Sequence, residues 1–163
     1  SRLDEGSEEL SAERVDLYDL SQKILQELTP VAAKRGISLH MEGGRQTIQG
    51  VWRILHEMIY NLCDNAIKYN KDGGAVTVRV TEEEDQVVVS VEDTGIGISE
   101  GQQDRVFERF YRVDKSHSRR VGGTGLGLSI VKHGAAYLGA KVTLESEEGK
   151  GSTFTLIFPK SSI

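Results

Sequence analysis

The stretch from Gly122 to His133 reads "GGTGLGLSIVKH", with alternating glycines followed by a helix-like apolar run. Glycines ahead of a helix often bind phosphate, because backbone N–H groups converge there and the helix dipole favours an anion. The spacing G-x-G-x-G is neither the dinucleotide pattern G-x-G-x-x-G nor the P-loop pattern, which ends in Gly-Lys-Ser/Thr. The stretch therefore predicts a phosphate-binding helix start of another architecture, and the rest of the chain has to identify it.

The composition is that of one soluble domain. The chain has 163 residues, a formal charge of −5 and a single cysteine, Cys63. The negative charge argues against general binding to nucleic acid or anionic membranes, so an anionic ligand needs locally placed positive groups. Cys63 lies in an apolar run, which predicts a buried thiol and a reducing compartment. No apolar run is long enough to span a membrane.

Hydrophobic periodicity predicts three helices, and several strand-like runs that would form a sheet of about five strands. The first helix follows an N-cap at Asp16 or Asp19 and stops at Gly36, and the others cover 51–69 and 124–138. The expected strands are 37–41, 46–50, 75–80, 86–93, 141–146 and 152–158. Two late hairpins and interspersed helices predict an α/β two-layer sandwich, with a mixed sheet covered by helices on one face.

The long helix carries polar side chains at helical spacing. Glu57, Asn61, Asn65 and Lys68 form a stripe that borders its apolar face. Two amides and an ammonium there could supply a Mg²⁺ ligand and a phosphate contact. The alternative is a solvated helix face, which two interior asparagines disfavour because Asn is a poor helix former. The preceding "HEMIY" lacks the second histidine of a zinc site.

A possible base-binding site follows the strand at 86–93. In "VEDTGIGIS" (91–99), Asp93 ends the strand and is followed by Gly95 and Gly97. A carboxylate at the end of a buried strand can accept a hydrogen bond from an exocyclic amine, and the glycines allow a flat ring to approach the backbone. The alternative is an ordinary Asp-Thr-Gly turn.

The most basic part of this acidic chain is "VFERFYRVDKSHSRR" (106–120), which leads into the glycine stretch. Basic side chains on a mobile segment beside a phosphate site predict a lid that closes on polyphosphate. The alternative is a solvated charged loop.

Together these motifs resemble the ATP-binding catalytic domain of bacterial sensor histidine kinases, in the superfamily shared with gyrase-type topoisomerases, a heat-shock chaperone and mismatch-repair ATPases. The resemblance covers roughly residues 15–159. The motifs, in chain order, are the N box "NLCDNAIKY", the first glycine box "DTGIGI", the F box "FERFYR", the second glycine box "GTGLGLSIVK" and the closing "GKGSTFTLIFP". It implies the Bergerat fold, with a mostly antiparallel sheet and three helices on one face.

The resemblance also implies roles for individual residues. Asn65 would bind Mg²⁺ beside Asn61, Lys68 and Arg112 would contact phosphate, and Glu57 would polarise an incoming imidazole. Asp93 would accept the adenine amino group, and Thr153 would lie close to it. The full set expected to contact ATP is Asn61, Asn65, Lys68, Tyr69, Asp93, Gly95, Gly97, Ile98, Phe110, Arg112, Gly123, Thr124, Gly125, Leu126, Gly127, Leu128 and Thr153.

The resemblance further implies the setting. Residues 1–14 would be a linker from an upstream dimerisation domain that carries the phosphate-accepting histidine, and 15–160 the catalytic domain, with a lid at about 106–123. This fragment, a monomer, would bind Mg-ATP without phosphorylating itself. The homodimeric parent, anchored in the bacterial inner membrane with this domain in the cytoplasm, would phosphorylate its histidine and pass the phosphoryl group to a response regulator. The tail from 131 to 151 is most similar to the phosphate-sensing branch.

Two alternatives remain open at this point. A related ATPase would carry a glutamate as general base where this chain has Asn61, and Asn cannot take a proton from water at neutral pH. A regulatory module that binds nucleotide without transferring phosphate should have lost some of the intact set Asn65, Asp93, Gly97 and Gly125. The kinase domain is therefore the favoured hypothesis.

Overall fold

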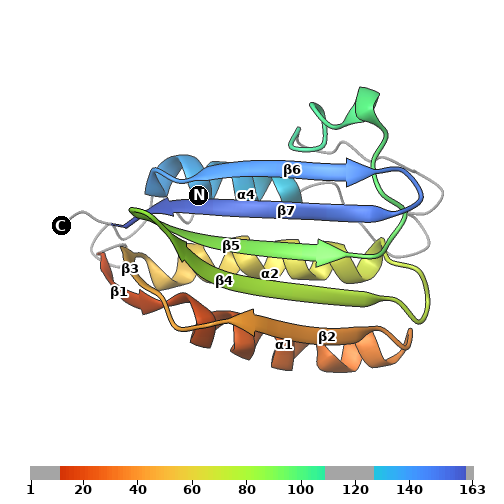
Figure 1. The fold of residues 1–163 in the computed structure, drawn as a ribbon, viewed down its shortest axis with the longest axis horizontal. Coiled ribbons are helices and arrows are strands. Elements are labelled where there is room, and N and C mark those ends of the chain that lie inside the picture. Colours follow the sequence, from red (N-terminus) through yellow and green to blue (C-terminus); the bar gives the residue numbers. More distant parts are fainter. Residues whose placement is uncertain (1–11, 109–126, 161–163) are drawn as a thin grey trace.

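The computed structural model describes residues 12–108 and 127–160. Its elements, in chain order, are β1 (Glu13–Asp16), α1 (Leu17–Ala33), β2 (Ser38–Gly43), β3 (Thr47–Gly50), α2 (Trp52–Lys68), β4 (Ala75–Glu83), β5 (Gln86–Asp93), η2 (Glu100–Gln102), α4 (Gly127–Leu138), β6 (Lys141–Glu147) and β7 (Gly151–Pro159). The two-layer sandwich is confirmed, because α1, α2 and α4 all lie behind one five-stranded sheet (Figure 1).

The sheet is mixed, as expected. Its strand order is β2-β4-β5-β7-β6, and only the β2–β4 pair among these strands is parallel. The predicted hairpins 75–93 and 141–158 form β4–β5 and β6–β7, and the two pack side by side through β5 and β7. This pairing places the end of β5 opposite the start of β7.

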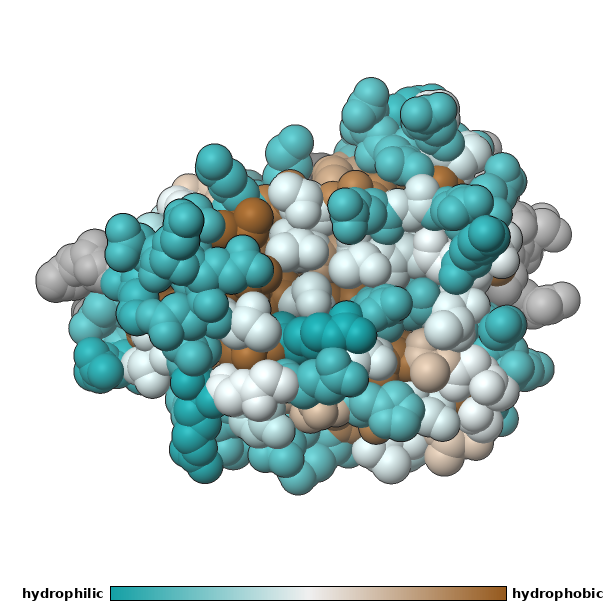
Figure 2. Space-filling view, in the orientation of Figure 1, coloured by the Kyte–Doolittle hydropathy of each residue, from teal (hydrophilic) through white to brown (hydrophobic). Residues whose placement is uncertain are grey.

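The core lies between the sheet and the helices. Alternate residues of the central strands point inward, and Val78, Val89 and Leu156 have no exposed surface. From the helices, Leu20 and Leu55 meet them with at most 2% of their surface exposed. The other face of the sheet carries mainly polar residues and is the hydrophilic surface in Figure 2. This one-sided burial is typical of an antiparallel sheet that packs one face on a core, although Val88 and Ile157 place apolar side chains on the outer face.

The start of the domain differs from the sequence-based prediction. The strand predicted at 46–50 is present as β3, but it pairs with β1 in a separate two-stranded sheet rather than joining the main sheet. Glu13 and Arg14, assigned above to the linker, therefore lie in β1. Asp16 then caps α1, because its Oδ1 accepts hydrogen bonds from the backbone N–H groups of Tyr18 and Asp19 at 3.0 and 3.1 Å.

Candidate nucleotide-binding site

The end of β5 holds a buried carboxylate. Asp93 is 9% exposed, and its Oδ1 accepts hydrogen bonds from the backbone N–H groups of Gly95 at 2.8 Å and Ser152 at 3.2 Å. Its Oδ2 accepts no hydrogen bond from the described part of the chain. Burial raises the pKa of Asp93 to about 6, and the two backbone hydrogen bonds offset part of that rise. One oxygen is thus held in place while the other can accept a hydrogen bond from a ligand.

The strand β7 supplies Ser152 rather than Thr153 to this site. In the β5–β7 register Ser152 lies opposite Asp93, whereas Thr153 lies opposite Glu92. Successive residues of a strand point to opposite faces, so Thr153 is directed to the outer face of the sheet. The expectation that Thr153 approaches Asp93 was therefore wrong by one residue. Ser152, which sequence reasoning missed, has the inward orientation.

A second hydroxyl, on β6, supports the same region. Ser146 Oγ accepts a hydrogen bond from the N–H of Ile98 at 2.7 Å, lies 2.7 Å from Ser152 Oγ and donates to the carbonyl of Gly151 at 3.0 Å. Gln103 Nε2 donates to the carbonyls of Ile98 at 2.9 Å and Ser146 at 3.2 Å. These contacts attach the segment after Asp93 to the β6–β7 hairpin.

The glycines of the first glycine box are required by close backbone approaches. A Cβ on Gly95 would lie 2.2 Å from the carbonyl oxygen of Tyr69, and one on Gly97 would lie 2.1 Å from that of Glu147. Gly97 also has a φ of +72°, which L side chains rarely adopt. In this structure the space at Gly97 is taken by the β6–β7 turn, which is a packing reason for a residue predicted to admit a nucleotide ring.

Helix α2 carries the predicted amides along the side of the site. The Nδ2 of Asn61 donates to the carbonyl of Glu57 at 2.6 Å, and its Oδ1 would lie 3.1 Å from a Cβ on Gly127, the first residue of α4. Lys68 forms an ion pair with Asp64 one turn earlier, with 3.1 Å between Nζ and Oδ2. The side chain of Asn65 makes no hydrogen bond within the described residues.

The structure thus brings together parts of four motifs from separate regions of the sequence. The N box meets the second glycine box where Asn61 lies beside Gly127, and it meets the first glycine box where Tyr69 lies against Gly95. The closing motif reaches Asp93 through Ser152. Leu128 is half-buried against the core next to Gly127. Phe110, Arg112, Gly123, Thr124, Gly125 and Leu126 lie outside the described residues, as does the predicted lid from 109 onward.

The first residues of the predicted lid, Val106 and Phe107, pack against the rest of the domain. Val106 is 3% exposed, and the ring of Phe107 packs edge-on against Phe154 of β7 with 6.0 Å between centroids. The Nζ of Lys132 on α4 lies 5.7 Å from the centre of the Phe107 ring. The first phenylalanine of the F box therefore joins β7 and α4.

Comparison with known proteins assigns the chain to a family. Residues 50–162 match the family described as histidine kinase-, DNA gyrase B- and HSP90-like ATPase, which is more than half of the chain. The chain belongs to this family. It is therefore an ATP-binding domain, and the motifs that meet around Asp93 are those by which the sequence resembled the family.

Individual relatives of this ATPase family agree. The chain is 39% identical to the sensor histidine kinase RppB of Synechocystis over 89% of its own length and 32% of that protein. It is 49% identical to the sensor-like histidine kinase SenX3 of Mycolicibacterium smegmatis over 66% of its own length and 28% of that protein. The chain thus spans about a third or less of these curated relatives.

Solved structures confirm the fold. A crystal structure of full-length ShkA in complex with AMPPNP superposes with a TM-score of 0.81 and 28% identity, covering 94% of this chain and 32% of that one. The mycobacterial sensor histidine kinase MprB gives a TM-score of 0.80 at 24% identity, over 93% of this chain and 99% of that one. Within the described residues, no helix is both long and apolar enough to cross a membrane.

The raised pKa of Asp93 predicts opposite pH dependences for stability and binding. The folded protein holds this proton more tightly than the unfolded chain, so the contribution to stability is complete below about pH 4 and is lost as pH rises through about 6. Acceptance of an amine hydrogen bond needs the carboxylate, so ATP affinity should rise over the same range. At pH 5 we expect affinity roughly tenfold below its value at pH 7.5, since one pH unit below the pKa leaves about a tenth of the carboxyl ionised.

The measurement is a titration of Asp93 by carboxyl ¹³C NMR, with calorimetric ATP affinities at each pH. The Asp93→Asn variant is the control, because the phosphates of ATP titrate equally with either protein. A ratio of the two affinities that stays constant from pH 5 to 7.5 would contradict the prediction.

Proposed function

We propose that this chain is the catalytic domain of a bacterial sensor histidine kinase, which binds Mg-ATP and donates the γ-phosphoryl group to a histidine on the dimerisation domain of the same protein. The observation that carries the proposal is the buried Asp93. Its Oδ1 is held by two backbone N–H groups, and its Oδ2 is able to accept a hydrogen bond from the amino group of adenine. Histidine kinases among the relatives support the choice of reaction.

The donor set fits a nucleotide-bound Mg²⁺. Within the described residues no three His, Cys, Asp or Glu side chains gather into a site that could hold a metal by themselves. Mg²⁺ commonly takes one or two protein oxygens together with substrate phosphates and water. Asn65, whose amide makes no other hydrogen bond in the described structure, would supply that protein oxygen. When bound, the ion would neutralise charge that develops on the transferred phosphoryl group.

The chain's own residues would position the nucleotide, and none at position 61 would act as a general base for water. Asp93 would orient the adenine ring, and Lys68 would exchange its partner Asp64 for a phosphate oxygen. Asn61 already donates to a backbone carbonyl and cannot act as a general base, which favours slow hydrolysis and transfer to a histidine. Glu57, one turn before Asn61, would polarise the incoming imidazole. Arg112 would stabilise the γ-phosphate from the lid.

The wider setting is part of the same proposal. The phosphate-accepting histidine would belong to a dimerisation domain, and the phosphoryl group would pass from it to the receiver domain of a response regulator. The parent would be a homodimer anchored in the cell membrane, with this domain in the cytoplasm. The similarity to SenX3 supports placing the parent protein near the branch of sensor kinases that contains SenX3.

The Mg²⁺ role of Asn65 is tested by calorimetric titration with a non-hydrolysable ATP analogue, with and without Mg²⁺. We expect Mg²⁺ to tighten binding to the wild type about tenfold, and Asn65→Ala to remove that gain, because a lost ligand or its supporting residue typically costs 10–100-fold in metal affinity. Alanine is a better helix former than asparagine, so the variant should fold at least as stably. Gln26→Ala, an exposed amide on α1, is the matched control. An unchanged Mg²⁺ effect in Asn65→Ala would contradict the assignment.

The transfer reaction is tested with radiolabelled ATP. The chain alone should retain no label, whereas addition of the parent's dimerisation domain should produce an acid-labile phosphohistidine on that domain. Release of inorganic phosphate over many turnovers per minute, without transfer, would instead favour a hydrolytic ATPase. Tight nucleotide binding with neither transfer nor hydrolysis would favour a regulatory module.

A further inference from the structure

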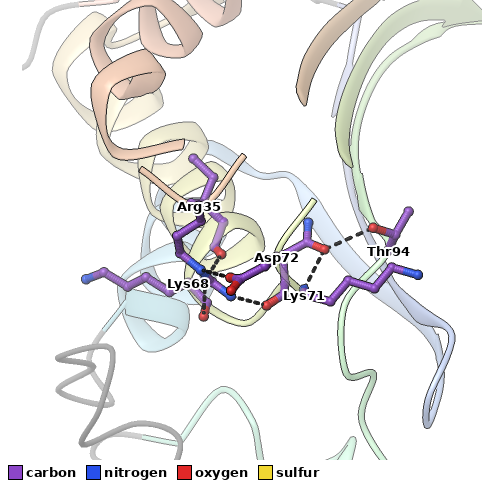
Figure 3. A network of polar contacts seen from close by, with 7 residues as sticks. Arg35, Lys68, Lys71, Asp72 and Thr94 are labelled. Atoms are coloured by element: carbon purple, nitrogen blue, oxygen red, sulfur yellow. Dashed lines mark hydrogen bonds and ion pairs between the residues drawn. The ribbon is translucent and has the colours of Figure 1, made fainter. Parts of the chain in front are cut away.

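Arg35, in the loop between α1 and β2, forms hydrogen bonds with residues at the end of helix α2 (Figure 3). Its Nη1 donates to the carbonyls of Ile67 at 2.6 Å and Lys68 at 2.9 Å, and its Nη2 donates to the carbonyl of Asn70. Its Nε donates to Asp72 Oδ1 at 3.0 Å. One guanidinium therefore contacts four residues at the end of the helix that carries the N box.

The three carbonyl contacts are the important ones. Two of these carbonyls, those of Ile67 and Lys68, are the last of α2, and that of Asn70 follows two residues later. The last carbonyls of a helix have no partner within it and lie at the negative end of its dipole, so a cation there is favoured. Asp72 is 83% exposed, and ion pairs so open to water contribute little. A planar guanidinium can donate to several carbonyls at once, whereas the ammonium of lysine is a single point charge. The loop backbone adds one more link, because the carbonyl of Arg35 accepts from the N–H of Gly73 at 3.0 Å.

The hydrogen bonds continue from Asn70 to the strand that bears Asp93. Asn70 is 1% exposed, and its Oδ1 accepts from the hydroxyl of Thr94 and from the N–H of Lys71, both at 2.9 Å. Its Nδ2 donates to the carbonyl of Ala75 at 3.0 Å, and the N–H of Ala75 donates to Thr94 Oγ1 at 3.0 Å. Thr94 directly follows Asp93 in the chain. The end of α2 and the end of β5 are thus held at one separation.

We propose that Arg35 is a positioning residue of the nucleotide site. It fixes the C-terminal end of α2, which carries the N box, relative to the end of β5. Asn65 and Lys68 lie on the helix at one side of this connection, and Asp93 lies on the strand at the other. Arg35 itself acts through Asn70 and Thr94 and contacts none of those three side chains. The inference rests on the proposed function, because it assumes that one nucleotide is bound by both sides.

The experiment compares Arg35→Ala and Arg35→Lys with the wild type in calorimetric titrations with the Mg-bound ATP analogue. We expect each variant to bind roughly tenfold more weakly, in line with the loss of supporting contacts around a ligand site. Arg79→Ala is the control, because Arg79 pairs with Glu42 and Glu92 on the exposed face of the sheet and has no contact with this network. It should bind within twofold of the wild type.

Chemical rescue distinguishes positioning from a general loss of stability. Millimolar ethylguanidinium should raise the affinity of Arg35→Ala for the Mg-bound analogue at least threefold over its value without the compound. Ethylammonium at the same concentration should leave that affinity unchanged. Should Arg35→Ala fold poorly, Arg35→Lys keeps the charge and the methylene chain and serves the comparison alone.

Each outcome has one interpretation. Wild-type affinity in both Arg35 variants, or weaker binding that follows only the unfolded fraction and is not rescued, would overturn the inference and leave the proposed function intact. Failure of the wild type to bind the Mg-bound analogue would instead overturn the proposed function, and the inference with it.

Discussion

Replacement of Asp93 by asparagine is expected to weaken ATP binding about 100-fold, because a hydrogen bond to a charged acceptor contributes about 1.5–3 kcal/mol and its loss to a buried site is felt in full. The carbonyl of the new amide would keep the position of Oδ1, which accepts from the N–H groups of Gly95 and Ser152. The amide nitrogen would then replace Oδ2. It would present N–H donors to the amino group of adenine, where a carboxylate presents an acceptor.

The same substitution is expected to stabilise the free protein at neutral pH. Burial raises the pKa of Asp93 from 3.8 to about 6, so the ionised carboxylate at pH 7 is a cost to folding. A neutral amide removes that cost, for a gain on the order of 2 kcal/mol. Loss of binding combined with higher stability is a signature that unfolding cannot produce.

Glu92→Gln provides the matched control. It removes the same charge one residue away, but Glu92 lies on the outer face of the sheet and pairs with Arg79 at 2.7 Å. Calorimetry should find its ATP affinity within twofold of the wild type, and urea denaturation should find no gain in stability. If Asp93→Asn bound ATP as well as Glu92→Gln does, Asp93 would not be the adenine acceptor.

Strong periodicity made the helices and the main sheet predictable from the sequence. The buried positions of α2 recur every three or four residues, and those of β4, β5 and β7 alternate over most of each strand. Strand β1 was not predicted, because its four residues include only one buried apolar side chain, Val15. Its partner β3 follows α1 and β2 in the chain, so no local sequence pattern predicts that β1 and β3 pair.

The motifs predicted which segments of the chain come together, but not the direction of each side chain. Choosing Thr153 over Ser152 is a shift of one residue, and in a strand such a shift exchanges the inner face for the outer. The contacts of Arg35 show a different limit. "KRG" after a helix resembles a solvated charged turn, and only the folded chain brings it to carbonyls more than 30 residues away. The ligand-binding roles given to individual residues all remain predictions, and Phe110, Arg112 and residues 123–126 also lie outside the described residues.

Gly95 shows why a glycine box can be required by packing as well as by ligand binding. An alanine Cβ there would lie 2.2 Å from the carbonyl oxygen of Tyr69 and 2.9 Å from the Cα of Asn70. Both atoms are backbone, so no side-chain rotation can relieve the overlap. The same carbonyl of Tyr69 accepts the N–H of Ile96 at 3.1 Å, which would have to lengthen or break.

Gly95→Ala is therefore expected to destabilise the protein by about 3 kcal/mol, at the upper end of typical overpacking costs, and to impair ATP binding in the molecules that stay folded. The binding defect follows because the N–H of Gly95 holds Asp93 Oδ1, so displacement of this residue also displaces the carboxylate. Gly101→Ala is the control within the same segment, since a Cβ there meets no atom within 4 Å. It should change stability by less than about 0.5 kcal/mol, as surface substitutions usually do. Urea denaturation and calorimetry on both variants measure the two effects, and equal stabilities would mean that β5 and α2 can separate at this point without cost.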